Sequence, residues 1–257
     1  MKRLIYILVS GLLLACSGYK IIPDEQLALI FHDAFLSNAY MQHPGMRPES
    51  LNLYEPIFAK YGTYNRASGA PFQRIGFNEA MEKYGSDKPD LRIDLTVEDI
   101  TEEVTGCGFG PFEGAVVKAV VVHDFTQTRK QIDKLCADAE VASGGNKAFW
   151  FRLDGNGELV GGISKFLGEK KEALVAKLGL KPNSFVAVSA GKKSAAQKTA
   201  GVLRKLLGAS VPGHMDQERY EFCWIVDFPM YEIGEESGQL EFCHNPFSMP
   251  QGGMQAL

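Results

Sequence analysis

The chain has 257 residues, of which 45% are apolar and 23% are charged, and its formal net charge is −4 at pH 7. This composition excludes a disordered chain, and the length allows one large domain or two small ones. The negative charge argues against broad electrostatic binding of nucleic acid, so a contact with RNA would need a local basic patch. Such a patch is Lys192, Lys193, Lys198, Arg204 and Lys205, for which a solvated helix face is the simpler interpretation.

The five cysteines are Cys16, Cys107, Cys136, Cys223 and Cys243. They form no CxxC pair, and no histidine lies at metal-ligand spacing from them. We therefore expect neither a metal site nor a disulfide framework. The last four are expected to be small buried hydrophobic residues.

Residues 1–16 have the pattern of an export signal. Lys2 and Arg3 precede an apolar run, Leu4 to Ala15, which is too short to span a bilayer. The sequence LLAC that ends at Cys16 resembles a bacterial lipobox. That resemblance implies acylation of Cys16 and a membrane anchor. The alternative is a buried N-terminal helix.

Residues 17–62 are predicted to form a small helical module. Apolar residues recur at helical spacing after Asp24 and Glu25, and Pro44 and Pro48 interrupt the pattern. The segment resembles a small lipoprotein module of Bacteroidetes-type bacteria, and it contains no residues that indicate chemistry. The polar segment that follows, residues 62–70, predicts a domain boundary or a join between two unrelated reading frames.

Residues 63–98 begin with this linker and continue into a predicted helix from Phe77 to Tyr84, which Gly85 would end. Ser86 to Asp90 follow as a turn. We expect a structural role there, with Asp87 or Asp90 accepting hydrogen bonds from backbone amides.

Residues 99–213 alternate between strand and helix patterns, which predicts an α+β domain with helices on one face of a mainly antiparallel sheet. Asp154-Gly155-Asn156-Gly157 is a hairpin turn signal. The helix from 128 to 142 is amphipathic, with Ile132, Leu135, Cys136 and Ala139 inward. The predicted strands are 113–122, 148–153, 158–164 and 184–189, and the other helices are 169–178 and 194–207.

Residues 220–249 predict a buried hairpin. Phe222 to Val226 has the apolar pattern of a strand that is covered on both faces, and a return strand is expected from Gln239 to Cys243. His244 and Asn245 follow it. A rigid strand end that presents an imidazole and an amide is a common way to form a substrate pocket. The alternative is a histidine that is satisfied at a turn.

Three segments carry a resemblance to a known family: PFQRIGFNEAMEKYGSDKPDLR (71–92), WIVDFPMYE (224–232) and HNPFSMPQGG (244–253). They resemble the catalytic domain of bacterial aspartyl-tRNA synthetases, which are class II enzymes. Between them the chain resembles the inserted domain that these enzymes share with the B subunit of the glutamyl-tRNA amidotransferase. The resemblance covers about residues 71–257. It implies that 99–213 is an inserted domain with a sandwich-like arrangement, and that 63–98 and 214–257 are pieces of the antiparallel catalytic core.

This resemblance implies an aspartate–tRNA ligase that uses ATP and Mg²⁺, binds tRNA and aspartate, and forms a homodimer in the cytoplasm. His244 corresponds to the histidine of the family's H-x-P-F motif, and Asn245 stands where the family often has a second histidine. Both are predicted to bind aspartate.

We assign no catalytic residue, because the ATP-binding motifs 2 and 3 of the family are not recognised in these 257 residues. Phe151 to Asp154 resembles motif 2 but leads directly into the hairpin turn, so Arg152 is interpreted as a strand residue. The chain is therefore expected to be inactive alone. The alternatives are a membrane-anchored lipoprotein with a binding or structural role, and a fusion or assembly artefact of the two parts.

Overall fold

The computed structural model describes residues 65–66, 72–234 and 237–242. The chain divides into two compact units, of which the second comprises residues 66–68 and 72–257. Strand β1 (Asn65–Arg66) lies at the sequence boundary between them. The predicted export signal, the predicted helical module and the residues Cys16, Cys243, His244 and Asn245 lie outside the described residues.

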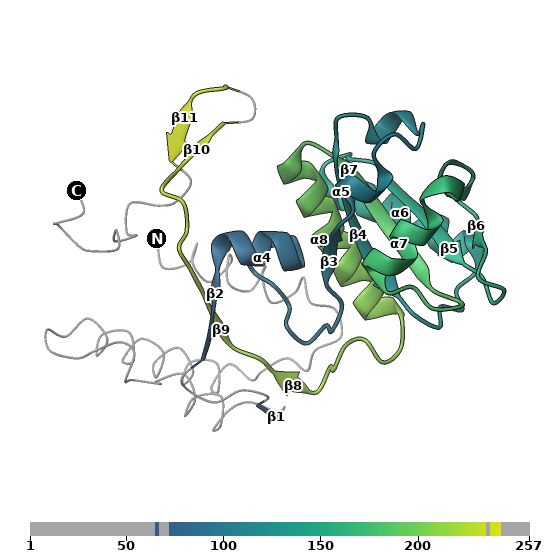
Figure 1. Cartoon of the computed structure of the whole chain (residues 1–257). Helices are drawn as coiled ribbons and strands as arrows, with labels where there is room; N and C mark the ends of the chain where they lie inside the picture. Colours follow the sequence, from purple (N-terminus) through teal and green to yellow (C-terminus); the bar gives the residue numbers. More distant parts are fainter. Residues whose placement is uncertain (1–64, 67–71, 235–236, 243–257) are drawn as a thin grey trace, which may run out of the picture. The chain divides into compact units, whose positions relative to one another are not determined.

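A five-stranded antiparallel sheet forms the centre of the second unit (Figure 1). Its strands lie in the order β3-β4-β7-β5-β6, so strands distant in sequence are neighbours. Together with its helices the sheet gives a mixed α+β fold, which confirms the predicted class. The strands are β3 (Val97–Asp99), β4 (Val116–Val122), β5 (Ala148–Leu153), β6 (Leu159–Val160) and β7 (Phe185–Gly191).

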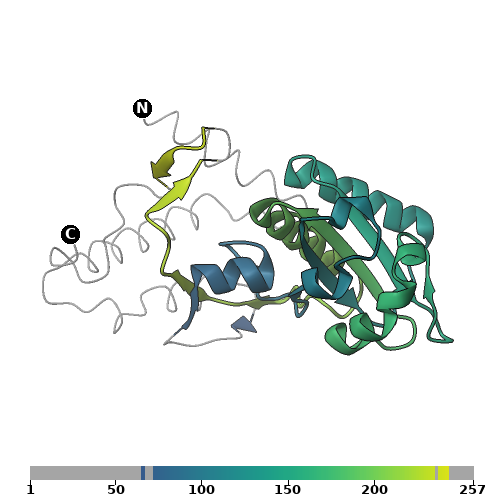
Figure 2. The ribbon, with the colours of Figure 1, turned by 45° about the horizontal axis from the view of Figure 1, so that its top comes forward.

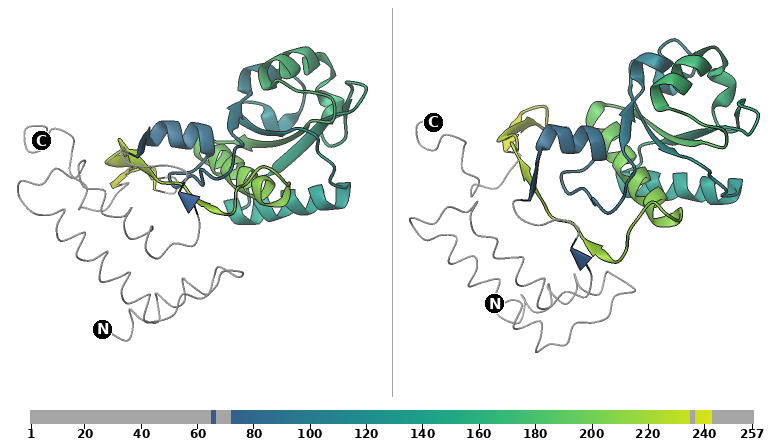
Figure 3. Two further views of the ribbon diagram at one scale, coloured as in Figure 1. Left: turned by 90° about the horizontal axis from the view of Figure 1, so that it is seen from below. Right: turned by 60° about the horizontal axis from the view of Figure 1, so that its bottom comes forward.

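Helices cover both faces of this sheet, as the left view of Figure 3 shows. Helices α6 (Arg129–Ser143) and α8 (Lys193–Ser210) pack on one face, and α5 (Thr101–Val104) and α7 (Lys171–Leu178) pack on the other. Three short 3-10 helices accompany α5 and α7: η2 (Gly110–Phe112), η3 (Ser164–Phe166) and η4 (Gly168–Lys170).

The expectation of helices on a single face is therefore wrong. In β4, Val120 and Val122 belong to the core beneath α6 and α8, whereas Val117 and Ala119 belong to the core beneath α5 and α7. Because both faces of the central strands are apolar, both need a covering layer to remove that surface from water.

Local signals set the ends of several elements as predicted. Helix α6 begins with a capping box between Thr128 and Gln131, and its predicted inward residues are all buried. In the turn after β5, Asp154 Oδ1 accepts hydrogen bonds from the amides of Asn156 (2.9 Å) and Glu158 (2.7 Å). The strand predicted for 158–164 is shortened to β6, because Gly161 and Gly162 turn with positive φ against Trp150.

The segments on either side of this sheet pair with each other. Strand β2 (Gln73–Gly76) lies parallel to β9 (Cys223–Val226), and helix α4 (Phe77–Tyr84) follows β2 directly. Helix α4 matches the predicted bounds and ends at Gly85, whose φ is +65°. Strand β8 (Arg219–Tyr220) precedes β9.

The predicted hairpin differs from the one found. Strand β11 (Leu240–Phe242) pairs with β10 (Tyr231–Ile233) and not with residues 222–226. The two segments predicted to form a buried hairpin are also not buried: Trp224 in β9 is 47% exposed, and Phe242 in β11 is 69% exposed. The sequence pattern showed the apolar runs, but the parallel partner of β9 lies about 150 residues earlier in the chain and leaves no local signal.

Candidate functional site

The carboxyl ends of β2 and β9 lie together. Gly76 pairs with Val226, so the first turn of α4 and the loop Asp227–Pro229 start from the same edge. The rings of Phe77 and Phe228 are 5.1 Å apart. Polar groups at the carboxyl ends of adjacent parallel strands commonly contact ligands. This edge is the candidate site on the described residues.

Asp227 is an acidic residue of this edge. Its φ of +59° places it in the left-handed region, which costs an aspartate less than most residues. Its side chain is exposed, and Oδ2 lies 3.9 Å from the position that a Cβ on Gly76 would take. A residue held in an uncommon backbone conformation at a strand end is typical of functional loops.

The hairpin that follows has two chemically different faces. In its register Tyr231 pairs with Phe242 and Ile233 pairs with Leu240, so four large apolar side chains share one face. They are 46% to 69% exposed. Glu232 and Glu241 pair on the opposite face, which is acidic.

The residues predicted to bind aspartate, His244 and Asn245, follow β11 by two and three positions and lie outside the described residues. Their role stays a prediction.

A buried lysine with two partly exposed carboxylate partners joins α4 to the sheet. Lys118 in β4 is only 1% exposed, and its Nζ donates hydrogen bonds to Asp99 Oδ2 at 2.9 Å and to Glu82 of α4. Glu82 also pairs with the exposed Lys193 at 2.6 Å. Burial opposes the charge on Lys118, but the bonds to Glu82 and Asp99 outweigh it and raise the pKa of Lys118. The bonds from these cations likewise outweigh burial and lower the pKa of Glu82.

Two chain segments form the connection between the sheet and its flanks. The backbone of Ile93 bridges that of Met215, and the amides of Asp94 and Asp216 donate across the two segments to His214 and Arg92 at 3.1 and 3.2 Å. The side chain of His214 is also 2.8 Å from Asp94. We call residues 90–95 and 214–216 the neck.

Arg204 of α8 organises the neck. It is 2% exposed and donates hydrogen bonds to the carbonyl oxygens of Leu95 (2.6 Å), Ile93 (2.8 Å) and Asp90 (3.0 Å). Burial lowers its pKa. Arg204 is therefore not part of a solvated basic face, unlike Lys192, Lys193, Lys198 and Lys205, which are exposed. The earlier interpretation is wrong for this residue, because helical spacing does not show which polar side chain finds buried carbonyl partners.

The turn from Ser86 to Asp90, which leads into the neck, has the predicted structural role. Asp90 accepts a hydrogen bond from the amide of Arg92 at 3.1 Å and two from its guanidinium. The side-chain bond from Arg92 is the main reason that the pKa of Asp90 lies below its ordinary value. Asp87 pairs with Lys88 at 2.8 Å.

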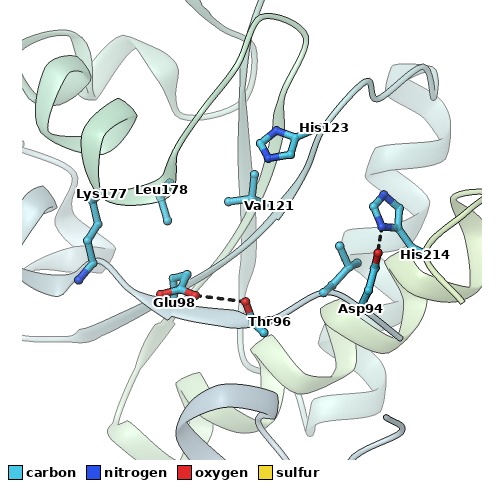
Figure 4. A pocket seen from close by; sticks show the side chains of 9 residues that line it. Asp94, Thr96, Glu98, Val121, His123, Lys177, Leu178 and His214 are labelled. Atoms are coloured by element: carbon cyan, nitrogen blue, oxygen red, sulfur yellow. Dashed lines mark hydrogen bonds and ion pairs between the residues drawn. The ribbon is translucent and has the colours of Figure 1, made fainter. Parts of the chain in front are cut away.

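A cavity of about 390 Å³ lies beside the neck (Figure 4). Its polar groups come mostly in pairs: Glu98 accepts a hydrogen bond from Thr96 at 3.1 Å, and His123 Nδ1 lies 2.8 Å from Ser184 Oγ. Its lining is Asp94, Leu95, Thr96, Glu98, Val121, His123, Lys177, Leu178 and His214.

Within residues 72–234 and 237–242, no three histidine, cysteine or acidic side chains are placed to hold a metal ion. In the cavity beside the neck, Thr96 is hydrogen-bonded to Glu98, and His214 is paired with Asp94.

Arg152 lies in β5, as interpreted. It donates a hydrogen bond to the carbonyl of Gln127, and its guanidinium lies 5.1 Å from the ring of Phe125 and 5.9 Å from that of Trp150. Burial lowers its pKa. These contacts place the side chain in the packing around Trp150, although its buried Nε has no hydrogen-bond partner among the described residues.

The described cysteines are free. Cys136 is buried, and burial raises the pKa of its thiol to about 12. Cys107 and Cys223 are half-buried, so only Cys136 fully matches the expected buried type. No described helix is both long and apolar enough to cross a membrane.

Sequence reasoning missed two parts of this arrangement. The pairing of Lys118 with Glu82 was missed, although a single lysine inside the apolar run AVVKAVVV indicates a buried charge that needs a partner. Asp227 was quoted only within the segment WIVDFPMYE. Its position between a strand and Phe228-Pro229 indicates a strand-end loop, but nothing local indicates its neighbour Gly76.

Residues 35–256 match the family described as tRNA synthetases class II (D, K and N). The match includes residues 35–70, which the sequence alone placed outside the resemblance, and it runs through the segment 62–70.

The chain is 45% identical over 207 residues to an aspartate–tRNA ligase of Streptomyces coelicolor, and the alignment covers 80% of this chain and 35% of that protein. It is 40% identical to an aspartate–tRNA(Asp/Asn) ligase of Zymomonas mobilis, with 78% and 34% covered. An aspartate–tRNA(Asp/Asn) ligase of Rickettsia prowazekii is 38% identical, with 80% and 36% covered.

The chain thus spans about a third of the length of these curated relatives. The family match extends over most of the 257 residues and includes the strand-end site, the neck and the five-stranded sheet. The chain belongs to the class II tRNA synthetases of the D, K and N group.

Proposed function

We propose that this chain provides part of an aspartate–tRNA ligase, an enzyme that attaches aspartate to tRNA at the expense of ATP. The supporting observation is the match of residues 35–256 to the synthetase family, together with relatives that are aspartate–tRNA ligases at 38% to 45% identity. The part that it provides comprises the strand-end site, the hairpin and residues 244–253, with residues 99–213 as the inserted domain. Aspartate, tRNA and a second copy of the subunit are the expected partners, in the cytoplasm.

In this proposal His244 and Asn245 hold aspartate. An imidazole and a side-chain amide both donate hydrogen bonds, and a neutral imidazole also accepts one, so the pair suits a carboxylate ligand. The hairpin β10–β11 precedes these residues in the chain, and its two strands pair in a defined register.

In the complete enzyme ATP would supply the adenylyl group that activates the carboxylate of aspartate, with pyrophosphate as the leaving group, and Mg²⁺ would offset the charge of the phosphates. Among the described residues, Arg152 is the one that resembles an ATP-binding arginine of the family, but it does not fit that role because it is engaged by Gln127, Phe125 and Trp150. Charge stabilisation in phosphoryl and acyl transfer depends on such groups, and loss of one typically costs on the order of a hundredfold in rate. We therefore expect the 257 residues alone to be inactive.

The test is a chimera. Residues 72–253 replace the aligned segment of the Streptomyces coelicolor ligase, and charging of tRNA with aspartate is measured. We expect activity, and we expect His244→Ala in the chimera to raise the KM for aspartate about tenfold or more, since it removes a substrate contact. A folded chimera without activity, or one in which His244→Ala leaves the KM unchanged, would contradict the proposal. The isolated chain should show no aspartate-dependent exchange of pyrophosphate into ATP.

The second candidate is a membrane-anchored lipoprotein. It rests on the lipobox sequence LLAC at Cys16 after a short apolar run. Because the family match runs through residues 62–70, a join between unrelated parts at that segment is not supported, and acylation of Cys16 is the test of this candidate.

A further inference from the structure

A long-range ionic link joins the five-stranded sheet to helix α4. Lys118 lies in the middle of β4 and is almost fully buried, but its two carboxylate partners come from different parts of the fold. Asp99 belongs to β3 of the same sheet, whereas Glu82 belongs to α4, 36 residues before Lys118 in the sequence. The ammonium group of Lys118 therefore pairs with one carboxylate of the sheet, Asp99, and with one of α4, Glu82.

A second contact holds the same helix. At the end of α4, Gly85 meets Gly201 of α8 backbone to backbone, and Figure 2 shows the two helices side by side. A Cβ built on Gly201 would lie 2.3 Å from the carbonyl oxygen of Gly85. Only residues without side chains permit this approach, so the contact fixes the C-terminal end of α4 on α8 and leaves the direction of the helix to its other contacts.

The beginning of α4 touches the candidate site. Phe77 packs against Phe228, and Gly76, which precedes the helix, pairs with Val226 next to Asp227. The contacts thus run from Lys118 through Glu82 and along α4 to the loop Asp227–Pro229.

We propose that Lys118 is a positioning residue that fixes the strand-end loop of Asp227 relative to the five-stranded sheet by holding α4 through Glu82. The inference rests on the proposed function only in calling that loop part of a ligase site. The link between Lys118 and the loop is inferred from the contacts of α4 with Lys118 and Phe228, which do not depend on that function. Since a helix moves as a unit, loss of the bond at Glu82 frees the end that carries Phe77 to reorient.

Residual dipolar couplings of the backbone amides of the full chain test this link. In the wild type, the amides of β2, α4 and β9 should fit the same alignment tensor as those of β4, β5 and β7. In Lys118→Met, the sheet amides away from position 118 should keep their chemical shifts, and the sheet should keep its alignment tensor. The couplings of α4, β2 and β9 should shrink by a third or more through averaging.

Lys193→Met is the matched control. Lys193 pairs with the same carboxylate at 2.6 Å, but its side chain is 65% exposed, so its removal should leave a single tensor. A single tensor in Lys118→Met would overturn the proposal, as would equal loosening by Lys193→Met.

Glu82→Ala covers the case in which Lys118→Met does not fold. It leaves Lys118 paired with Asp99 and should loosen α4 in the same way, whereas a single tensor in this variant would also overturn the proposal. The readout uses neither aspartate nor ATP nor tRNA. A negative result in the dipolar couplings would therefore contradict the link between Lys118 and α4, whereas an inactive chimera would contradict the proposed function.

Discussion

Gly201 in α8 meets Gly85 at the end of α4 so closely that a Cβ on Gly201 would lie 2.3 Å from the carbonyl oxygen and 2.8 Å from the carbonyl carbon of Gly85. The neighbouring atoms are backbone, which cannot rotate away as a side chain can. Two elements that are more than 100 residues apart thus depend on the absence of a side chain at one position.

Gly201→Ala should therefore destabilise the protein, although alanine is the better helix former. Overpacking of this kind costs about 1–3 kcal/mol, more than the gain in helix propensity of about 1 kcal/mol. Urea unfolding measures the difference. Gly168→Ala is the control, because nothing lies within 4 Å of its Cβ position, and it should change the stability little. Equal midpoints for the two variants would contradict the close approach.

Acid should weaken the cluster around Lys118. The pKa values of Glu82 and Asp99 lie below their ordinary values of 4.5 and 3.8, since the bonds that they accept outweigh burial. Each carboxylate thus contributes stability that is fully present above its unfolded pKa and is lost as the pH falls through the folded value. We expect the free energy of unfolding to decrease below about pH 5.

Glu82→Gln should flatten this decrease in urea titrations between pH 3 and 7. The exposed residue Glu113 provides the control, Glu113→Gln, which should keep the wild-type slope. A slope that Glu82→Gln does not change would show that other groups cause the acid sensitivity.

Arg204→Met should loosen the neck. The variant keeps much of the side-chain volume but removes the donor to the carbonyl oxygens of Leu95 and Ile93, whereas the carbonyl of Asp90 keeps the amide of Ile93 at 3.3 Å. Buried acceptors without partners cost about 1–3 kcal/mol each, less where water enters, so we expect a loss of roughly 2–4 kcal/mol in stability. Lys205→Met, at the next and exposed position, should be nearly neutral. Amide exchange of Asp94 and Asp216 should accelerate only in the Arg204 variant.

Cys136 should be inert towards alkylation in the folded protein. Its thiol is buried and its pKa is raised to about 12, so almost no thiolate exists at pH 8. Iodoacetamide labelling followed by peptide mass spectrometry should modify the half-buried Cys107 before Cys136, which should react only in denaturant. Labelling of Cys136 at the rate of Cys107 under native conditions would argue against the packing of α6 on the sheet.

Export of the chain, if it occurs, should depend on Cys16. The lipobox sequence predicts acylation of this thiol, and labelling with a fatty-acid analogue in a bacterial host detects it. Incorporation into wild type and none into Cys16→Ala would support the lipoprotein candidate. Equal incorporation into both would end it.

The sequence by itself determined the elements whose ends depend on neighbouring residues. Helix α4 ends at Gly85 because a left-handed residue closes it, α6 starts at the Thr128 capping box, and Asp154 to Gly157 form the turn after β5. The apolar spacing of α6 also gave its buried face, since Ile132 and Leu135 depend only on helical periodicity. The segments at 71–92 and 224–232 likewise indicated the synthetase family, which the comparisons confirmed.

Only the tertiary structure decided which distant segments meet. The parallel pairing of β2 with β9, the burial of Arg204 against neck carbonyls and the contact between Lys118 and Glu82 all join residues that are far apart in the chain. Their local sequences allow other partners: an apolar run pairs equally well in a hairpin, and an arginine on a helix is usually solvated. These contacts are selected by the burial of two apolar faces on one sheet, because that burial brings the segments together and removes water as a partner of the buried Lys118 and Arg204 side chains.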